Sequence, residues 1–254
     1  MITASGLVLA AATAVAAGMV GCFAVMRRMT LAADAISHVA LPGIAIALIV
    51  KLNPLVGALA MLTVGAVLIW AVELRTRIAT ETITGVVFSV ALALGAMLSS
   101  GDQLLDALFG APGALTQMQL WLGLVGAAAI VAFVIYQRNA LIVGLVSPEI
   151  ALTCGINVAR LNLMFLLTFA LTVGLGLRYL GVLLMGSLVI IPAATARRLA
   201  RSLRAMFATA TVVAVVATVG GSYLAELSGR ASGPFIIVVA GAIFFLSLLR
   251  PAPA

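Results

Sequence analysis

Two residues whose side chains can bind ions lie one helical turn apart in the first quarter of the chain. Asp34 and His38, the only histidine, are four positions apart beside a long apolar run. Residues i and i+4 of a helix share a face, so we expect the carboxylate and the imidazole to point at one spot. An unpaired charge at a bilayer centre costs about 2.5–3.5 kcal/mol or more, so such residues normally have a partner or a function. The pair therefore predicts a place that could hold a divalent cation.

Two other roles fit the same residues, because a single Asp-x-x-x-His spacing is a weak motif. Asp34 could be the N-cap of an apolar helix that begins near Ile36, accepting backbone amide hydrogens. His38 could be a buried neutral imidazole bonded to a backbone carbonyl. Pro42 is expected to break the helix just after His38, freeing carbonyl oxygens that line a path or accept water. An ordinary membrane-helix kink is the alternative for this proline.

The elements that position this pair are expected to be membrane helices. The chain has 254 residues, of which 65% are hydrophobic and 8% charged, and its mean hydropathy is +1.31. Soluble proteins are about 45–50% apolar and about 25% charged, so the composition predicts an all-α integral membrane protein. The net charge of +7 reflects basic residues at the ends of apolar runs, which indicates membrane topology rather than nucleic-acid binding. Cys22 and Cys154 stand in unlike surroundings and indicate neither a disulfide nor a thiolate metal site.

Nine apolar runs are candidate spans of a single transmembrane domain, residues 1–254. A crossing helix needs about 20 residues, and the second and seventh runs are short and contain Pro42 and Pro192. These two could be tilted, broken or incomplete crossings, so we expect a polytopic bundle of eight or nine transmembrane helices. Glycines near the seventh run, including Gly181 and Gly186, are expected to allow close helix packing. The runs are 5–26, 36–52, 54–72, 82–100, 119–137, 161–177, 180–195, 206–225 and 234–249.

Arginine placement predicts the orientation of the chain. Most arginines fall on alternate connections, and the positive-inside rule assigns that side to the cytoplasm. The amino terminus is then outside and the carboxyl terminus inside. The opposite side carries Asp102 and Asp106, which share a helical face and could draw cations or form a solvated loop. The arginines on the inner side are Arg27, Arg28, Arg75, Arg77, Arg138, Arg160, Arg197, Arg198, Arg201, Arg204 and Arg250.

A second informative stretch is the inner connection 146–160. Ser147 followed by Pro148 is a typical helix start, and Glu149 complements the positive end of the helix dipole. Gly155 can end the helix or turn the chain sharply. The segment predicts a short amphipathic helix between two spans. It is either a well-made connection or a rigid knob that docks into a groove of a partner.

Nothing in the chain predicts an enzyme. The sequence has no phosphate-binding G-x-x-x-x-G-K-[ST] loop, its one lysine, Lys51, lies at a span end, and no soluble domain fits between the spans. If ATP drives this protein, the ATPase is another polypeptide.

Three stretches resemble the motifs of a known family, the membrane permeases of metal-ion ABC importers for zinc, manganese and iron(II). D-A-I-S-H-V-A-L-P-G at 34–43 is similar to the family signature. P-E-I-A-L-T-C-G-I-N-V-A-R-L at 148–161 resembles the coupling segment that contacts the ATPase, and G-V-L-L-M-G-S-L-V-I-I-P-A-A-T-A-R at 181–197 resembles a third motif. The motifs occur in the family's order, and the resemblance runs from about Gly18 to Leu203.

The resemblance implies a homodimer in the bacterial cytoplasmic (inner) membrane, surrounded by lipid, with two cytoplasmic ABC ATPases and an extracytoplasmic metal-binding protein. It implies neither a permanently bound cofactor nor nucleic acid. A two-fold axis would bring together two copies of the Asp34 and His38 pair. Such nitrogen and oxygen ligands suit zinc, manganese or iron(II) and do not suit copper(I), and because the imidazole must be neutral, uptake should weaken below about pH 6.5. The implied coupling residues are Ser147, Pro148, Glu149, Ala151 and Gly155, and the residues that could contact the outer partner are Asp102, Asp106 and Arg178.

Other functions remain open at this point. A permease for iron–siderophore or cobalamin chelates would share a similar coupling segment but would need a wide path and no ion-binding pair. A proton-driven secondary transporter could use Asp34 and His38 as a proton relay. An intramembrane metallohydrolase is disfavoured, because one histidine per chain would hold a metal poorly. The same ligands serve zinc, manganese and iron(II), so the sequence does not choose among them.

Overall fold

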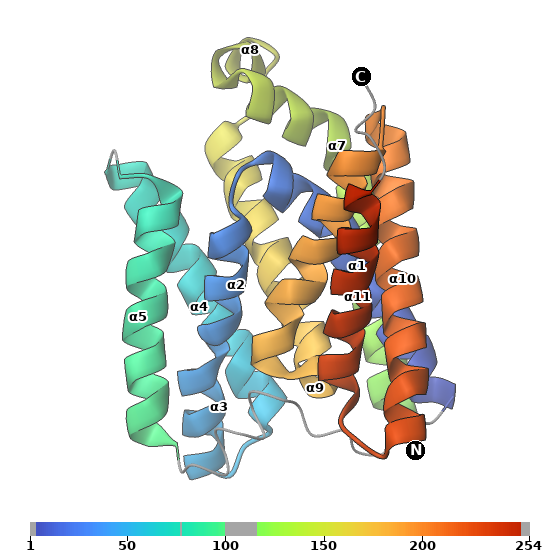
Figure 1. Cartoon of the computed structure of the whole chain (residues 1–254). Helices are drawn as coiled ribbons and strands as arrows, with labels where there is room; N and C mark the ends of the chain where they lie inside the picture. The colour runs from blue at the N-terminus through green and yellow to red at the C-terminus, as the bar shows by residue number, and fades with distance from the viewer. Residues whose placement is uncertain (1–3, 77, 100–115, 250–254) are drawn as a thin grey trace.

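The computed structural model describes residues 4–76, 78–99 and 116–249, and within them the chain consists of helices and short connections. Most of the helices lie roughly side by side as a bundle, and the short helix α8 projects from one end (Figure 1). The all-α architecture predicted from composition is therefore confirmed. The helices are α1 (Ala4–Met26), α2 (Thr30–His38), α3 (Ala40–Ile49), α4 (Pro54–Arg75), α5 (Thr80–Leu98), α7 (Gln117–Val146), α8 (Pro148–Thr153), α9 (Val158–Leu199), α10 (Leu203–Ser228) and α11 (Ser232–Leu248).

Several of these helices can cross a membrane. Among the described residues, six helical segments are long and apolar enough by length and composition, and Asp34–Ile49 and Ser232–Leu248 are shorter apolar segments. Each of the nine apolar runs overlaps a helix. The chain is thus a multi-pass membrane protein. The six long segments are Ala4–Met26, Pro54–Arg75, Thr80–Leu98, Gln117–Val146, Val158–Leu177 and Leu203–Ser228.

Helix α9 contains both the sixth and the seventh apolar run, and its chain reverses at Gly181. The φ of Gly181 is +73° and its ψ is 173°, a backbone conformation that essentially only glycine adopts. A Cβ on Gly176 would lie 2.0 Å from Sδ of Met185, although nine residues of straight helix would separate them by roughly 13 Å. Gly181 therefore makes a turn between two arms, which is a different role from the close packing expected of it.

The break expected in the seventh run is absent from the structure. Pro192 lies inside the second arm of α9, which continues to Leu199. Proline removes one intrahelical hydrogen bond, but neighbouring helices can stabilise the remaining turns. The helix is therefore not broken at Pro192, whereas a tilted or incomplete crossing by this run stays a prediction.

The second apolar run forms two helices in succession. Helix α2 begins at Thr30, six residues before the expected start at Ile36, and ends at His38. Helix α3 begins at Ala40, and it continues α2 toward the other end of the bundle (Figure 1). Pro42 has no amide hydrogen for the carbonyl four residues before it, which is that of His38. Helix α2 is thus divided from α3 at Val39, three residues before Pro42, and Val39 itself has helical backbone angles. A pathway kink at Pro42 stays a prediction.

Helix α1 is the most buried of the six long apolar segments. It packs against α7, α9 and α10, and 67% of the residues in its most apolar stretch are buried. The corresponding share is 22% for α5 and for α7, whose outward side chains include Val86, Val125 and Ile135. Such exposed apolar surface on long helices suits contact with lipid or with another membrane subunit.

Arginines at the end that carries α8 also bind the ends of helices. Arg197 donates a hydrogen bond to the carbonyl of Val25 at 3.1 Å, near the end of α1. Arg198 donates to the carbonyls of Ser247 and Leu248 at 3.1 and 3.0 Å, at the end of α11. The last carbonyls of a helix have no intrahelical partner, so these contacts satisfy them. These two arginines have a structural role in addition to the topology that their positions indicate.

Candidate functional site

The predicted ion-binding pair lies in the interior of a helix. Asp34 is the fifth residue of α2, which starts at Thr30, and the N-cap residue Met29 makes no side-chain capping hydrogen bond. Asp34 is therefore too far along the helix to be its N-cap. That alternative role for the aspartate is excluded.

The histidine is packed between helices and one of its nitrogen atoms has no partner. His38 is 7% exposed, and its ring meets the ring of Phe88 on α5 edge to face, with 5.3 Å between centroids. Within the described part of the chain, Nδ1 of His38 is buried without a hydrogen-bond partner. The structure thus gives no support to an imidazole held by a backbone carbonyl through this atom. A buried polar atom without a partner costs roughly 1–3 kcal/mol, which a bound ligand would recover.

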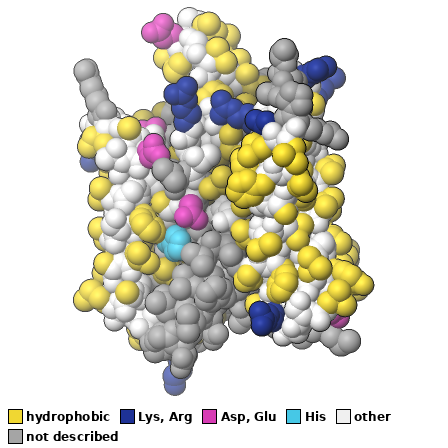
Figure 2. Space-filling model, in the orientation of Figure 1, with side chains coloured by type: hydrophobic (Ala, Val, Ile, Leu, Met, Phe, Trp, Pro, Cys, Tyr) yellow, Lys and Arg dark blue, Asp and Glu magenta, His cyan; other side chains and the backbone are white. Residues whose placement is uncertain are grey.

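The carboxylate of Asp34 lies beside this imidazole and against the second arm of α9. Asp34 is half-buried and interacts electrostatically with His38. A Cβ on Gly186 would lie 2.4 Å from Oδ1 and 2.8 Å from Cα of Asp34. Gly186 therefore clears the space that the aspartate occupies. Figure 2 shows the histidine, in cyan, about midway between the two ends of the molecule.

Within the described ranges, one copy of the chain offers only part of a metal-ligand set. Among the described residues, no three His, Cys, Asp or Glu side chains come together in a group that could hold a metal ion. Zinc needs four ligands in a structural site, or three protein ligands and a water in a catalytic site. Asp34 and His38 therefore need further donors from water or from another chain.

The segment 147–155 forms the short helix predicted from the sequence. The Ser147 side chain accepts a hydrogen bond from the amide of Ile150 at 3.3 Å, Pro148 follows at the helix start, and Glu149 lies in the first turn. Gly155 has a φ of +75° and turns the chain after the helix. Ser147, Pro148, Glu149 and Gly155 thus have the local structural roles that their types predict.

Helix α8 presents apolar side chains beyond the bundle. Ala151 is buried, whereas Ile150 is 56% exposed and Leu152 is 64% exposed. Helix α8 lies at the tip of the molecule in Figure 1, beyond the ends of α7 and α9. Exposed apolar residues on a projecting helix are typical of a surface that another protein covers.

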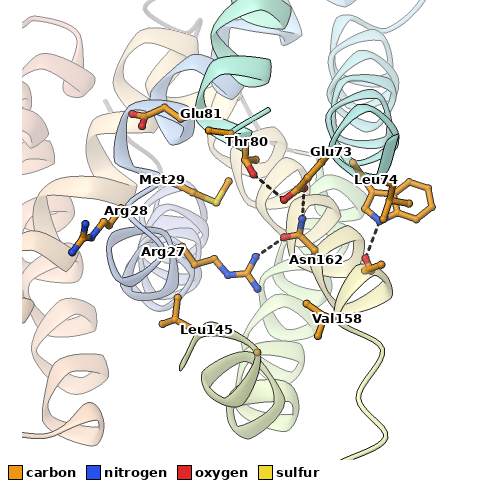
Figure 3. A pocket seen from close by; sticks show the side chains of 14 residues that line it. Arg27, Arg28, Met29, Glu73, Leu74, Thr80, Glu81, Leu145, Val158 and Asn162 are labelled. Carbon is orange, nitrogen blue, oxygen red and sulfur yellow. Dashed lines mark hydrogen bonds between the residues drawn. The ribbon is translucent and has the colours of Figure 1, made fainter. Parts of the chain in front are cut away.

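A polar network that sequence reasoning missed lies at the same end of the bundle. Asn162 on α9 accepts a hydrogen bond from Nη1 of Arg27 at 2.5 Å, and its own amide donates to Oε2 of Glu73 on α4. The hydroxyl of Thr80 on α5 donates to Oε1 of Glu73 at 2.8 Å. Figure 3 shows these side chains converging in a cavity of about 530 Å³.

The charged members of this network stabilise each other away from bulk water. Burial lowers the pKa of Arg27, and the nearby charge of Glu73 opposes that change. The guanidinium of Arg27 also lies 4.5 Å from the ring centre of Phe165, a cation–π contact. The sequence signal was available, because Glu73 and Asn162 are polar residues inside or beside apolar runs, where a partner is expected.

Some predicted residues lie outside the described part of the structure. Asp102 and Asp106 fall within residues 100–115, and the side chain of Arg178 also lies outside the described set. Their contact with an outer partner stays a prediction.

The chain is similar over nearly its whole length to known membrane permeases. The model of the "ABC 3 transport family" matches residues 1–251. The high-affinity zinc uptake system membrane protein ZnuB of Haemophilus influenzae is 30% identical over 251 residues, which are 97% of this chain and 95% of that protein. The manganese transport system membrane protein MntC of Listeria monocytogenes is 32% identical over 239 residues, 92% of this chain and 85% of that protein.

A solved structure has the same fold. PsaBC from Streptococcus pneumoniae, in complex with a Fab, matches 97% of this chain and 90% of its own chain with a TM-score of 0.83 and 29% sequence identity. The matched family model, the similar relatives and this fold agree with the three motifs of the sequence. The chain therefore belongs to the ABC 3 transport family and is a membrane permease of the metal-ion ABC importer type.

Proposed function

We propose that this chain is the membrane subunit of an ATP-driven importer that moves a divalent metal ion, zinc, manganese or iron(II), into the cytoplasm. The observation that carries the proposal is the buried Nδ1 of His38 beside Asp34, midway along the bundle. Two similar relatives are named for zinc and for manganese, which supports a cargo of this kind. Nitrogen and oxygen ligands suit all three ions.

The complete site forms between two copies of the chain. A two-fold axis beside α2 would supply two carboxylates and two imidazoles, and the two carboxylates would balance the charge of a divalent ion. Since the described residues of one chain contain no group of three such ligands, a second copy is a natural source of the others. Binding must be strong enough to admit the ion from an outer metal-binding protein and weak enough to release it.

The end that carries α8 is the cytoplasmic end in this proposal. Figure 2 shows most of the visible Lys and Arg side chains gathered there, as the positive-inside rule requires. The amino terminus is then outside, the carboxyl terminus inside, and the single domain 1–254 crosses the bacterial inner membrane eight or nine times. Two ATPase chains dock at α8 and perform the hydrolysis, so this subunit is not itself an enzyme. The residues proposed to contact the outer metal-binding protein are Asp102, Asp106 and Arg178.

The test is uptake of radiolabelled zinc, manganese or iron(II) by proteoliposomes that contain the permease, its ATPase and its metal-binding protein. His38→Ala and Asp34→Ala should each lower uptake by about tenfold or more, since loss of a ligand costs at least as much as loss of its supporting contacts. Thr218→Val is the matched control, because Oγ1 of Thr218 is also buried without a partner among the described residues. It should leave uptake unchanged.

Three outcomes would contradict the proposal. Full metal uptake by His38→Ala would remove the histidine from the site. Uptake of a metal chelate that survives in His38→Ala would favour a chelate permease. Uptake by the permease alone, without any ATPase, would identify a secondary transporter.

A further inference from the structure

The polar network of Arg27, Glu73, Thr80 and Asn162 joins elements that are far apart in the sequence. Arg27 and Asn162 are 135 positions apart, and Asn162 and Glu73 are 89 positions apart. The network therefore connects the end of α1, the end of α4, the start of α5 and the start of α9 at a single point (Figure 3).

On one side, the network begins directly behind α8. Helix α9 starts at Val158, a few residues after α8 ends at Thr153, and Asn162 lies in its first two turns. In the same turns, the carbonyl of Ala159 accepts a hydrogen bond from Nε1 of Trp70 on α4 at 2.8 Å. The start of α9 is thus tied to α4 both by Trp70 and by the bond from Asn162 to Glu73, so a shift of α8 would reach this junction first.

On the other side, the network ends at the connection that leads into the metal-site helix. Arg27 follows α1, which ends at Met26, and α2 begins at Thr30 and carries Asp34 and His38. The contact of Arg27 with the ring of Phe165 holds the guanidinium against α9 as well. A displacement of the start of α9 would therefore pull on the start of α2.

An amide is the side chain that this junction requires. Asn162 places an acceptor toward the cation of Arg27 and a donor toward the anion of Glu73. An aspartate could not donate to Glu73, and a leucine of similar size would leave both charged groups without this partner. A polar network with all its bonds made is rigid, so movement at one end is passed on rather than absorbed.

We propose that Asn162 is a positioning residue that transmits movement of α8 to α2. The inference rests on the proposed function, in which an ATPase moves α8 and the α2 pair holds the metal. The competing account is purely structural, with the network only holding four helix ends together. If the role were only structural, substitution of Asn162 would lower stability, assembly and every activity in proportion. If Asn162 is a relay, the substitution removes the response of α2 to nucleotide and leaves the response of α8.

The test measures backbone amide hydrogen exchange in the assembled complex of permease and ATPase. Exchange is compared between the complex without nucleotide and the complex with ATP and vanadate. In the wild type, nucleotide should change exchange both in α8 and in the segment 27–38. In Asn162→Leu, the change in α8 should remain while the change in 27–38 is lost. Asn157→Ala is the matched control: the Asn157 side chain caps the same helix, accepting from the Arg160 amide at 2.9 Å, but lies outside the network. It should respond like the wild type.

Glu73→Gln provides a second variant that keeps the shape of the side chain. It should reduce the nucleotide-dependent change in exchange of 27–38 only in part, because the glutamine side chain keeps one of the two acceptor oxygens. In the double variant with Asn162→Leu, the metal moved per ATP hydrolysed should fall no further than in Asn162→Leu alone, since both changes break one unit. In transport assays, the metal moved per ATP hydrolysed should fall by roughly two- to thirty-fold in Asn162→Leu.

Several results would overturn the relay. The response of 27–38 could persist in Asn162→Leu, could be absent from the wild type, or could be lost equally in Asn157→Ala. Additive losses in the double variant would also count against a single unit. Failure of the proposed function has a different signature: the wild-type proteoliposomes would move no metal, while nucleotide-dependent exchange in 27–38 would still report on the relay.

Discussion

At the scale of single residues, Gly186 determines where the carboxylate of Asp34 can lie. The atoms of Asp34 nearest to a Cβ at this position include its own Cα at 2.8 Å, which is backbone and cannot swing away like a flexible side-chain end. The third motif of the chain thus contributes to the proposed site by the absence of a side chain, while the first motif contributes the proposed ligands.

Gly186→Ala should separate α2 from α9 and misplace Asp34. We expect metal uptake to fall by about 10- to 100-fold, as it does when the outer contacts of a metal ligand are lost. The measurement is uptake by proteoliposomes at several metal concentrations. Gly85→Ala is the control, because a Cβ there meets nothing within 4 Å. Unchanged uptake in Gly186→Ala would show that α2 and α9 can part without disturbing the site.

At the scale of elements, the turn at Gly181 makes one helix into two arms with separate contacts. The first arm carries Asn162 near α8, and the second carries Gly186 against Asp34. The turn depends on a positive φ that other residues rarely adopt.

Gly181→Ala should destabilise the fold by about 1–3 kcal/mol, because a Cβ strains this backbone conformation. The change is measured as the midpoint of thermal unfolding of the purified protein in detergent. Gly241→Ala, in open space within α11, should leave that midpoint unchanged or raise it, since alanine favours helix over glycine by up to about 1 kcal/mol. Equal midpoints for the two variants would mean that the turn does not need a glycine.

Helix α8 carries a prediction of its own about docking. Ile150→Asp places a charge on an exposed apolar position and should weaken copurification of the ATPase by about tenfold or more, a loss of about 1.4 kcal/mol in binding. Thermal stability of the permease should stay the same, because the residue does not support the bundle. Asn139→Asp, at an exposed position on α7, introduces the same charge elsewhere and should leave copurification intact. An ATPase that still copurifies with Ile150→Asp would point to a docking surface other than α8.

How much the sequence predicted depends on whether a feature is local. Composition predicted the membrane helices, and the residues of 147–155 predicted a helix start and a turn, because capping and glycine geometry act within a few positions. The predicted start of α2 was six residues too late. The N-cap residue Met29 makes no side-chain capping hydrogen bond, so the local sequence does not mark this boundary. His38 contacts Phe88, and Asn162 binds Arg27 and Glu73, across distant segments of the chain. A polar residue in an apolar run indicates that a partner exists, but spacing in the sequence does not identify which residue it is.

At the scale of the whole molecule, the proposed site between two copies of the chain predicts a ratio of metal to protein. We expect the purified protein to bind one metal ion per two chains, and Asp34→Ala to bind much less. Metal analysis together with native mass spectrometry measures this ratio. One ion per chain would mean that each copy completes its own site with water, and the two-fold arrangement would then be wrong.

The two thiols of the chain differ in a way that makes docking observable. Cys22 is fully buried, whereas Cys154 is exposed and directly follows α8. A thiol-reactive dye would therefore mark the natural protein at one site, beside the projecting knob, without any engineered cysteine. Its fluorescence would report when another protein covers that tip, and would do so in real time.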